Sequence, residues 1–170
     1  MRLETERLVI TEFDFSMAES LHKNSLDEDN KRFVPDEVFE TLEDAKETVD
    51  FLISCYDSER GPFVYAVINK NNLKNMGYVQ LVYLDDMYEV GYHIAKQYTG
   101  QGYATKALKL FLKCLKEKTN ASVLLGICLK ENKASARVLE KCGFIKLYEG
   151  IGTYQGEERE IIRTAIDLSK

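Results

Sequence analysis

The sequence predicts an α/β fold in which helices cover both faces of a mixed, largely antiparallel sheet of six to seven strands. Apolar runs of strand length lie close together in the middle of the chain, and the short polar turns between them favour antiparallel neighbours. Two segments, 42–56 and 102–118, instead repeat their apolar residues at helical spacing. The continuously apolar run 123–129 is typical of a strand that is covered on both faces.

The N-terminal third is expected to contain a strand and two helices. We expect a strand at 8–13, a helix at 16–23, and an irregular segment or short helix at 24–40. Ser16 is placed to cap the first helix. Thr41 opens the second helix, with Asp44 three residues later in a capping-box position. Gly61-Pro62 ends that helix.

The remainder of the chain supplies most of the expected sheet. Strands are expected at 63–68, 76–84, 88–95, 123–129, 144–153 and 159–168, and helices at 102–118 and 133–141. Gly143 lies in a C′ position that ends the last helix. No linker or repeat interrupts this pattern, so we expect one domain over residues 1–170.

Composition excludes several classes of protein. The chain has no window near the roughly 18 apolar residues that span a bilayer, and its start lacks an apolar signal region, so we expect a cytoplasmic protein without a membrane partner. Its cysteines, Cys55, Cys114, Cys128 and Cys142, form no CxxC pair, which predicts reduced thiols and no metal site. No basic stripe is present that would bind nucleic acid. We expect a monomer or homodimer.

The negative charge is concentrated in one segment. Residues 27–50 hold ten acids and three bases, a net charge of −7 within a chain of −5, which leaves +2 for the rest. A solvated loop and helix face is one interpretation of this segment. The other is an acidic rim that attracts a cationic acceptor.

The stretch from Val90 to Ala104 carries the clearest chemical signal. It consists of a strand, a turn with Gly100 and Gly102, and the start of an amphipathic helix. Such a turn can direct several backbone N–H groups into one concavity, and the helix adds unpaired N–H groups and the positive end of its dipole. These features suit an anion such as a pyrophosphate. The segment is neither a Walker loop nor a GxGxxG fingerprint.

Two blocks of sequence resemble those of Gcn5-related N-acetyltransferases (GNAT). Gln97-x-x-Gly100-x-Gly102-x-Ala104 is similar to the family motif that grips the coenzyme A pyrophosphate. The block Asn132-x-x-Ser135-x-Arg137-Val138-Leu139-Glu140-Lys141-x-Gly143-Phe144 and the opening Leu3-x-Thr5-Glu6-Arg7-Leu8 resemble the RimJ/RimL-like ribosomal-protein N-terminal acetyltransferases. The resemblance covers essentially the whole chain.

The resemblance implies acetyl-CoA as co-substrate and a sheet that is splayed between the strands near 90–95 and 122–129. The pantetheine arm would lie in the gap and pair with the first of these strands. The coenzyme-binding residues implied are Val90, Tyr92, Ile94, Gln97, Tyr98, Thr99, Gly100, Gln101, Gly102, Tyr103, Ala104, Asn132 and Ser135. Asn132 also suits an ordinary helix cap, and Ser135 a small helical residue.

Catalysis of amine acylation needs a base for the acceptor ammonium, donors for the oxyanion and a proton for the leaving thiolate. The candidate catalytic residues are Glu89, as the base, and Ser135, near the thiol. Glu89 also suits a solvated carboxylate at a strand end. His93 has an intrinsic pKa that suits a catalytic base, and the other interpretation of His93 is a packed or hydrogen-bonded side chain. Leu139 stands where many relatives carry a tyrosine that protonates the thiolate, so Ser135 or water are the candidates for that role.

The resemblance favours the α-amine of a protein N-terminus as acceptor. A polyamine or an aminoglycoside is the alternative, because the acidic segment 27–50 would suit either cation. A non-catalytic acyl-CoA-binding module is a further alternative, which the missing tyrosine favours and Glu89 disfavours. No covalent nucleophile is expected, because a neutral amine attacks a thioester directly.

Overall fold

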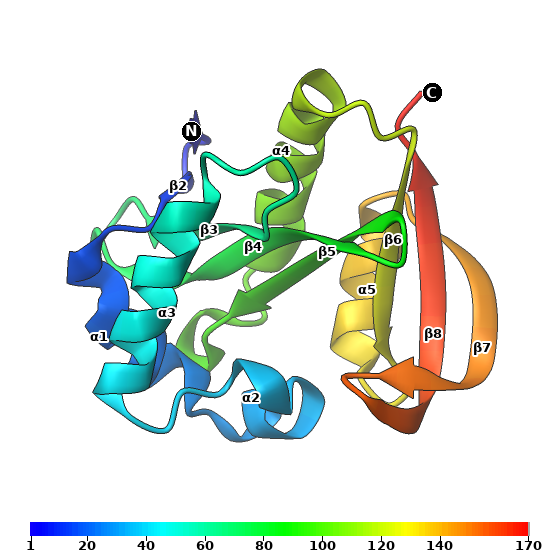
Figure 1. Cartoon of the computed structure of the whole chain (residues 1–170), viewed down its shortest axis with the longest axis horizontal. Helices are drawn as coiled ribbons and strands as arrows, with labels where there is room; N and C mark the ends of the chain where they lie inside the picture. Colours follow the sequence, from blue (N-terminus) through cyan, green and yellow to red (C-terminus); the bar gives the residue numbers. More distant parts are fainter. Residues whose placement is uncertain (170) are drawn as a thin grey trace.

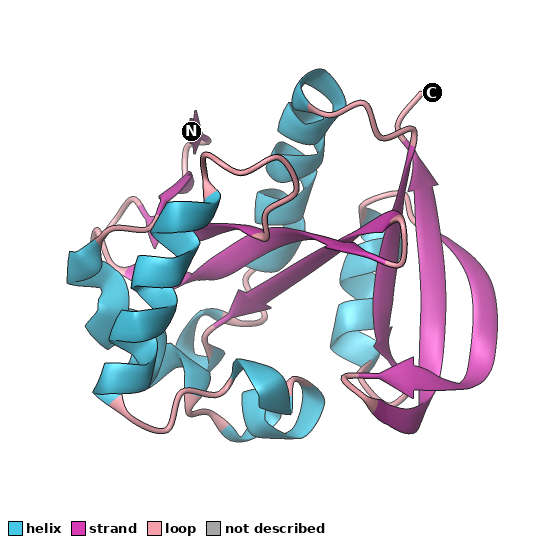
Figure 2. Cartoon of the chain, viewed as in Figure 1, coloured by secondary structure: helices cyan, strands magenta, loops and turns pink. Residues whose placement is uncertain are grey.

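The computed structural model describes residues 1–169, and its centre is an eight-stranded sheet (Figures 1 and 2). The strands are β1 (Arg2–Glu4), β2 (Leu8–Glu12), β3 (Phe63–Asn69), β4 (Asn75–Leu84), β5 (Met87–Ile94), β6 (Val123–Leu129), β7 (Ile145–Tyr154) and β8 (Glu157–Asp167). Their order is β1-β2-β3-β4-β5-β6-β8-β7. Every neighbouring pair is antiparallel except β5 and β6, which are parallel. The mixed, largely antiparallel sheet is therefore confirmed.

The sheet has one strand more than the sequence predicts. β1 has three residues, of which only Leu3 is apolar, and it pairs with β2 by placing Leu3 opposite Ile10. A single apolar residue between two charged ones carries no periodic signal. Residues 2–4 form a strand because they pair with β2.

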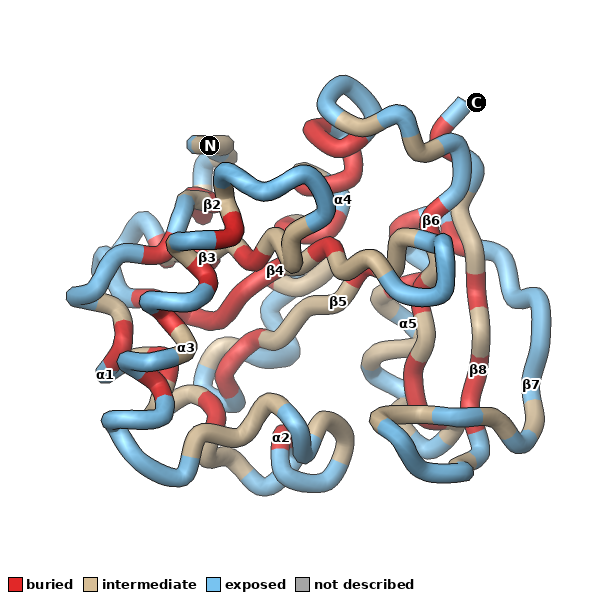
Figure 3. Tube along the Cα trace, viewed as in Figure 1, coloured by how far each residue is buried: buried red, intermediate tan, exposed pale blue. Residues whose placement is uncertain are grey.

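Helices cover both faces of the sheet, as expected. They are α1 (Ala18–Ser25), α2 (Glu28–Phe33), α3 (Leu42–Cys55), α4 (Tyr103–Lys118) and α5 (Lys133–Lys141), with 3₁₀ helices at Phe15–Met17, Pro35–Glu37 and Lys96–Tyr98. One core cluster lies under α1 and α3 and is built around Val49, Ala66 and Tyr78. A larger cluster lies under α4 and α5 and is built around Phe111 and Leu124. Figure 3 shows buried positions along β3, β4 and α4.

The helix starts confirm one prediction and correct another. Thr41 and Asp44 form the predicted capping box at the start of α3. Ser16 does not cap the first helix: Asp14 accepts a hydrogen bond from the Ser16 N–H and starts a 3₁₀ turn, and α1 follows at Ala18. The capping carboxylate is that of Asp14, so the first turn begins two residues earlier than predicted.

The sheet opens between β5 and β6. These strands pair only at Tyr88 with Leu124, Glu89 with Leu125 and Val90 with Gly126, although β5 continues to Ile94 and β6 to Leu129. Figure 2 shows the two strands diverging beyond this contact. The splay that the resemblance implies is present, and it begins after Val90, the residue that follows Glu89.

No helix among residues 1–169 is long and apolar enough to cross a membrane.

Candidate active site

The opening between β5 and β6 leads into a cleft of about 1240 Å³. Two sets of side chains line it. One set comes from the start of α4 and from α5, and the other comes from the α2 segment, β4 and the turn between β7 and β8. Glu89, on the part of β5 that pairs with β6, also lines the cleft. We call these two sets of residues, the second of which includes 27–37, the first and second arms of the cleft, and the paired end of β5 that carries Glu89 their junction.

The first arm begins at the turn between β5 and α4. Gly100 and Gly102 adopt φ angles of 74° and 80°, which place both residues in the left-handed region. Within residues 1–169, no hydrogen bond engages the backbone N–H groups of 100–105. These donors stand at the positive end of the 16-residue helix α4. A Cβ on Gly100 would meet no atom within 4 Å, so the turn is open to a ligand. The donors present fit a pyrophosphate.

Most of the predicted coenzyme residues lie in this arm. The cleft is lined by Val90, Tyr92, Ile94, Tyr98, Thr99, Gly100, Gly102, Tyr103, Ala104, Asn132 and Ser135. Gln97 and Gln101 are exposed and lie outside the cleft lining. The Gln101 side-chain amide donates a hydrogen bond of 3.3 Å to the Gln97 carbonyl, which closes the turn on its outer side. The structure therefore places these two side chains where they shape the turn and do not face the cleft.

Ser135 sits on α5 and faces β5 across the cleft. The Asn132 side chain accepts a hydrogen bond of 3.2 Å from the Ser135 N–H and caps α5. The Tyr92 hydroxyl lies 2.8 Å from the Ser135 Oγ and 2.9 Å from its carbonyl oxygen. Burial raises the pKa of the Tyr92 phenol well above its ordinary value. The Tyr92 hydroxyl therefore stays protonated and ties α5 to β5.

The Glu89 carboxyl group is shielded from water at the junction of the two arms. Burial raises its pKa to about 7, and the negative charge of Glu37 adds to the increase, whereas Arg163 opposes it. A carboxylate with a pKa near neutrality is suited to accept a proton from an amine at physiological pH. The environment of Glu89 therefore differs from the solvated strand end that was the alternative.

Glu37 is a second half-buried carboxyl group, which the sequence did not single out. It ends the 3₁₀ helix Pro35–Glu37, where the Tyr78 hydroxyl and the Gln80 Nε2 donate hydrogen bonds to it. Burial raises the pKa of Glu37, and the Gln80 hydrogen bond and the charge of His93 only partly offset this. In the sequence Glu37 is one acid among ten in an acidic segment, and nothing in its spacing distinguishes it.

His93 forms a hydrogen bond, one of the two interpretations offered for it. Its Nε2 lies 3.3 Å from Asp27 Oδ2, and its side chain is 12% exposed. Burial acts to raise the pKa of Asp27, but the hydrogen bond with His93 and the Asn30 N–H outweigh it, so the pKa of Asp27 is lowered. His93 thereby holds the start of α2 against β5.

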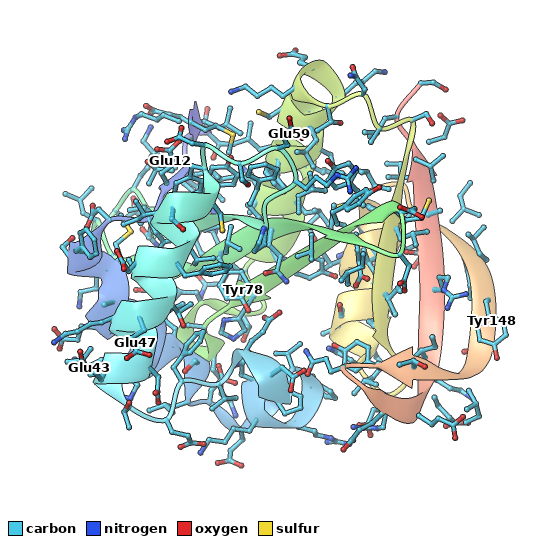
Figure 4. All side chains as sticks on the ribbon, in the orientation of Figure 1. Glu12, Glu43, Glu47, Glu59, Tyr78 and Tyr148 are labelled. Atoms are coloured by element: carbon cyan, nitrogen blue, oxygen red, sulfur yellow. The ribbon has the colours of Figure 1, made fainter. Side chains whose placement is uncertain are left out.

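The acidic segment divides between the two interpretations. Asp27, Asp29, Asp36 and Glu37 line the cleft, and Asp85 joins them from the turn between β4 and β5. The acids of α3 instead face solvent, and Figure 4 shows Glu43 and Glu47 on the outer side of that helix, away from Tyr78. One part of the segment thus lines the second arm, and the other part is a solvated helix face.

Contacts across the second arm join α2 and the 3₁₀ helix after it to the C-terminal hairpin and to the turn before α5. The Tyr154 hydroxyl donates a hydrogen bond of 2.8 Å to the Phe33 carbonyl. The Gln155 Oε1 accepts a bond of 3.1 Å from the Asp36 N–H. Arg32 forms an ion pair of 2.7 Å with Glu131 at the start of α5. We call these three contacts the bridge. It ties the segment that carries Glu37 to the opposite side of the cleft.

The fold and both arms of the cleft can be compared with known proteins. Residues 7–145 match the acetyltransferase (GNAT) domain family. The chain belongs to this family. It is 28% identical over 145 residues to the uncharacterised N-acetyltransferase YnaD of Bacillus subtilis (strain 168), over 84% of this chain and 82% of that one. The predicted family is thereby confirmed.

Solved GNAT structures share the fold along the whole length. An acetyltransferase of the GNAT family from Bacillus anthracis superposes with a TM-score of 0.85 and 25% identity over 100% of both chains. RimL, a ribosomal L7/L12 α-N-protein acetyltransferase in complex with coenzyme A, superposes with a TM-score of 0.82 and 16% identity over 98% of each chain. As a GNAT enzyme, the chain transfers an acetyl group from acetyl-CoA to an amine.

Proposed function

We propose that this GNAT enzyme acetylates the α-amine of a protein N-terminus, with Glu89 as the general base. The observation that carries the proposal is the Glu89 carboxyl group, which is half-buried at the junction of the two arms with a pKa of about 7. A base of that pKa matches an α-ammonium group, whose pKa is about 8. A lysine or polyamine ammonium has a pKa of about 10 and holds its proton more strongly by roughly 3 kcal/mol.

Coenzyme binding is assigned to the first arm. The N–H groups of 100–105 and the start of α4 would hold the pyrophosphate, and the strand edge of β5 beyond Val90 would pair with the pantetheine arm. Bound acetyl-CoA supplies the acetyl group as a thioester, which is open to direct attack by a neutral amine. Asn132 caps α5, and the Tyr92 hydroxyl holds Ser135 beside β5.

The second arm would receive the acceptor. Asp29, Asp36 and Glu37 attract an ammonium group toward Glu89, which accepts its proton directly or through one water molecule. Glu37 raises the pKa of Glu89 and so makes it a stronger base. The bridge holds the segment that carries Glu37 on this side of the cleft.

Ser135 is proposed as the group that returns a proton to the leaving thiolate. Leu139 is 1% exposed and packs against β6 at Gly126, where a Cβ would lie 2.6 Å from its Cδ2 atom, so it belongs to the core. Ser135 is the hydroxyl of α5 that lines the cleft, and Tyr92 fixes its position. The structural likeness to RimL, whose described substrate is a ribosomal protein, supports the protein N-terminus as acceptor.

A small cationic acceptor is the second candidate. It is favoured by the carboxylates Asp27, Asp29, Asp36 and Asp85 along the second arm, because a polyamine or aminoglycoside carries several ammonium groups. The two candidates differ in one respect. A second positive charge on the acceptor would strengthen binding of a polyamine or aminoglycoside, whereas a protein N-terminus needs only its α-ammonium group.

The pH dependence of the reaction tests the role of Glu89. With a peptide acceptor, kcat/KM should fall tenfold per pH unit below about 7, because Glu89 gains a proton there. Glu89→Gln should lower kcat by roughly 100-fold or more. Its acid limb should move up to about pH 8, because only acceptor amine that is already neutral can react in the variant. An unaltered pH–rate profile in the variant would reject Glu89 as the base.

A further inference from the structure

The side chain of Arg7 reaches the turn before α4, although Arg7 lies far from that turn in the sequence. Arg7 belongs to the opening segment Thr5-Glu6-Arg7-Leu8. The Arg7 Nη1 donates a hydrogen bond of 2.8 Å to the carbonyl oxygen of Gln101. Its guanidinium carbon lies 4.1 Å from the centre of the Tyr103 ring. We infer that Arg7 is a positioning residue for the coenzyme, because it fixes the peptide group that presents the Gly102 N–H to the pyrophosphate.

Peptide geometry explains how one hydrogen bond can set the direction of a donor. In a planar trans peptide the carbonyl and the following N–H point in opposite directions. The Gln101 carbonyl points toward Arg7, so the N–H of Gly102 points away from Arg7. Gly102 has a φ angle of 80° and no side chain to restrict this peptide group, so an outside contact must hold its orientation.

Arg7 is itself held in a closed frame of contacts. Its backbone carbonyl accepts a hydrogen bond of 3.0 Å from the Lys70 N–H. The neighbouring residue, Asn69, donates from its side chain to the Tyr103 hydroxyl at 3.2 Å. Asn69 and Tyr103 are both buried, with 4% exposure each. The backbone and the guanidinium of Arg7 are thus joined through the end of β3 to the first residue of α4.

The frame uses a property that is specific to arginine. The guanidinium is planar, so it stacks on an aromatic ring while its N–H groups donate in the plane. A lysine ammonium would keep the positive charge near the turn but would not provide the flat surface over Tyr103. Lysine at position 7 therefore distinguishes two effects of Arg7: the orientation of the turn, which lysine would lose, and the attraction of the phosphates by positive charge, which lysine would keep.

Binding measurements with two ligands test the inference, which rests on the proposed coenzyme site. Coenzyme A carries the pyrophosphate, and pantetheine does not. Arg7→Ala should raise the Kd for coenzyme A about tenfold, the range expected when a hydrogen bond to a charged group is lost. Arg7→Lys should also weaken binding at least threefold, and the Kd for pantetheine should stay within twofold of wild type in both variants. Arg2→Ala is the matched control, since that guanidinium contacts Glu4 and not the turn.

Hydrogen–deuterium exchange of the coenzyme-free protein separates positioning from general loss of stability. In Arg7→Ala the peptide covering 98–104 should exchange faster, while peptides from β4 and β8 keep their wild-type rates. Equal coenzyme affinity in Arg7→Ala, wild-type affinity in Arg7→Lys, or equal weakening of both ligands would overturn the inference. Failure of the wild-type protein to bind coenzyme A would instead contradict the coenzyme site itself.

Discussion

At the scale of single residues, Glu89 combines two effects that act in the same direction. Its carboxylate is partly removed from water, which raises its pKa. The negative charge of Glu37 raises the pKa of Glu89 further. Arg163 offsets these effects only in part. The site therefore keeps a base near neutrality at the expense of folded-state stability, which is common where catalytic groups are buried.

The stability cost of Glu89 can be measured. Its folded-state pKa of about 7 exceeds the ordinary value of 4.5, so between these pH values the folded protein holds a proton that the unfolded chain has lost. The free energy of unfolding should therefore fall as pH rises through this window. Glu89→Gln should be more stable than wild type by up to about 3 kcal/mol at pH 8, with little difference at pH 4.5.

Denaturant titrations at a series of pH values provide that comparison. Glu47→Gln, on the exposed face of α3, is the matched control and should shift stability by less than about 0.5 kcal/mol throughout. A Glu89→Gln difference that stays constant between pH 4.5 and 8 would show that the carboxyl group is not destabilised by burial.

At the scale of elements, the turn before α4 and the turn between β7 and β8 offer a matched pair of glycines. Gly100 and Gly156 have φ angles of 74° and 79°, and a Cβ on either would meet no atom within 4 Å. Alanine at each should therefore lower stability by a similar 1–2 kcal/mol, roughly the left-handed penalty. Only Gly100→Ala should raise the Kd for coenzyme A, by about tenfold or more. Calorimetry on both variants decides this, and equal coenzyme affinity would remove the turn from the binding site.

The bridge makes a prediction about the acceptor. Tyr154→Phe removes the hydroxyl that donates to the Phe33 carbonyl at 2.8 Å and leaves that oxygen unpaired. The segment that carries Glu37 should loosen, so KM for the acceptor should rise at least threefold while the Kd for coenzyme A stays unchanged.

Steady-state kinetics with a varied acceptor tests the bridge. Tyr148→Phe is the control, because the Tyr148 hydroxyl donates to the Ile151 carbonyl and, within residues 1–169, makes no contact with α2. Figure 4 shows Tyr148 at the outer edge of the molecule. If Tyr154→Phe and Tyr148→Phe give the same acceptor KM, the bridge has no part in acceptor binding.

At the scale of the whole molecule, much of the fold follows from local sequence. The apolar periods of α3 and α4 and the turns between strands are local signals, and the structure confirms them. β1 and the Asp14 cap were missed because they depend on pairing or on one side-chain contact. The parallel contact of β5 with β6, which opens the sheet, involves residues about 35 positions apart, so it came from family resemblance and not from periodicity.

The residues of the site likewise fall into two groups, those that local sequence predicts and those that it does not. The glycine turn and Glu89 are adjacent in sequence to a strong strand–helix pattern, and they could be proposed from it. Glu37, Tyr154 and Arg7 gain their positions from segments distant in the chain, through contacts with Gln80, Phe33 and Gln101. A single sequence carries no record of those contacts. The acidic segment illustrates the limit, because the fold turns one part into a cleft wall and leaves the other part in solvent.

The central claim is catalysis at the junction with an α-amine as acceptor. The most direct test is thiol release from acetyl-CoA with a panel of amines at pH 7.5: short peptides with free N-termini, the same peptides with blocked N-termini, spermidine and an aminoglycoside. We expect release with the free peptides, and this release should be lost when the N-terminus is blocked and when Glu89 is replaced by glutamine. Release with spermidine or the aminoglycoside alone would contradict the proposed acceptor. Tight coenzyme binding without release for any amine would contradict catalysis at this site.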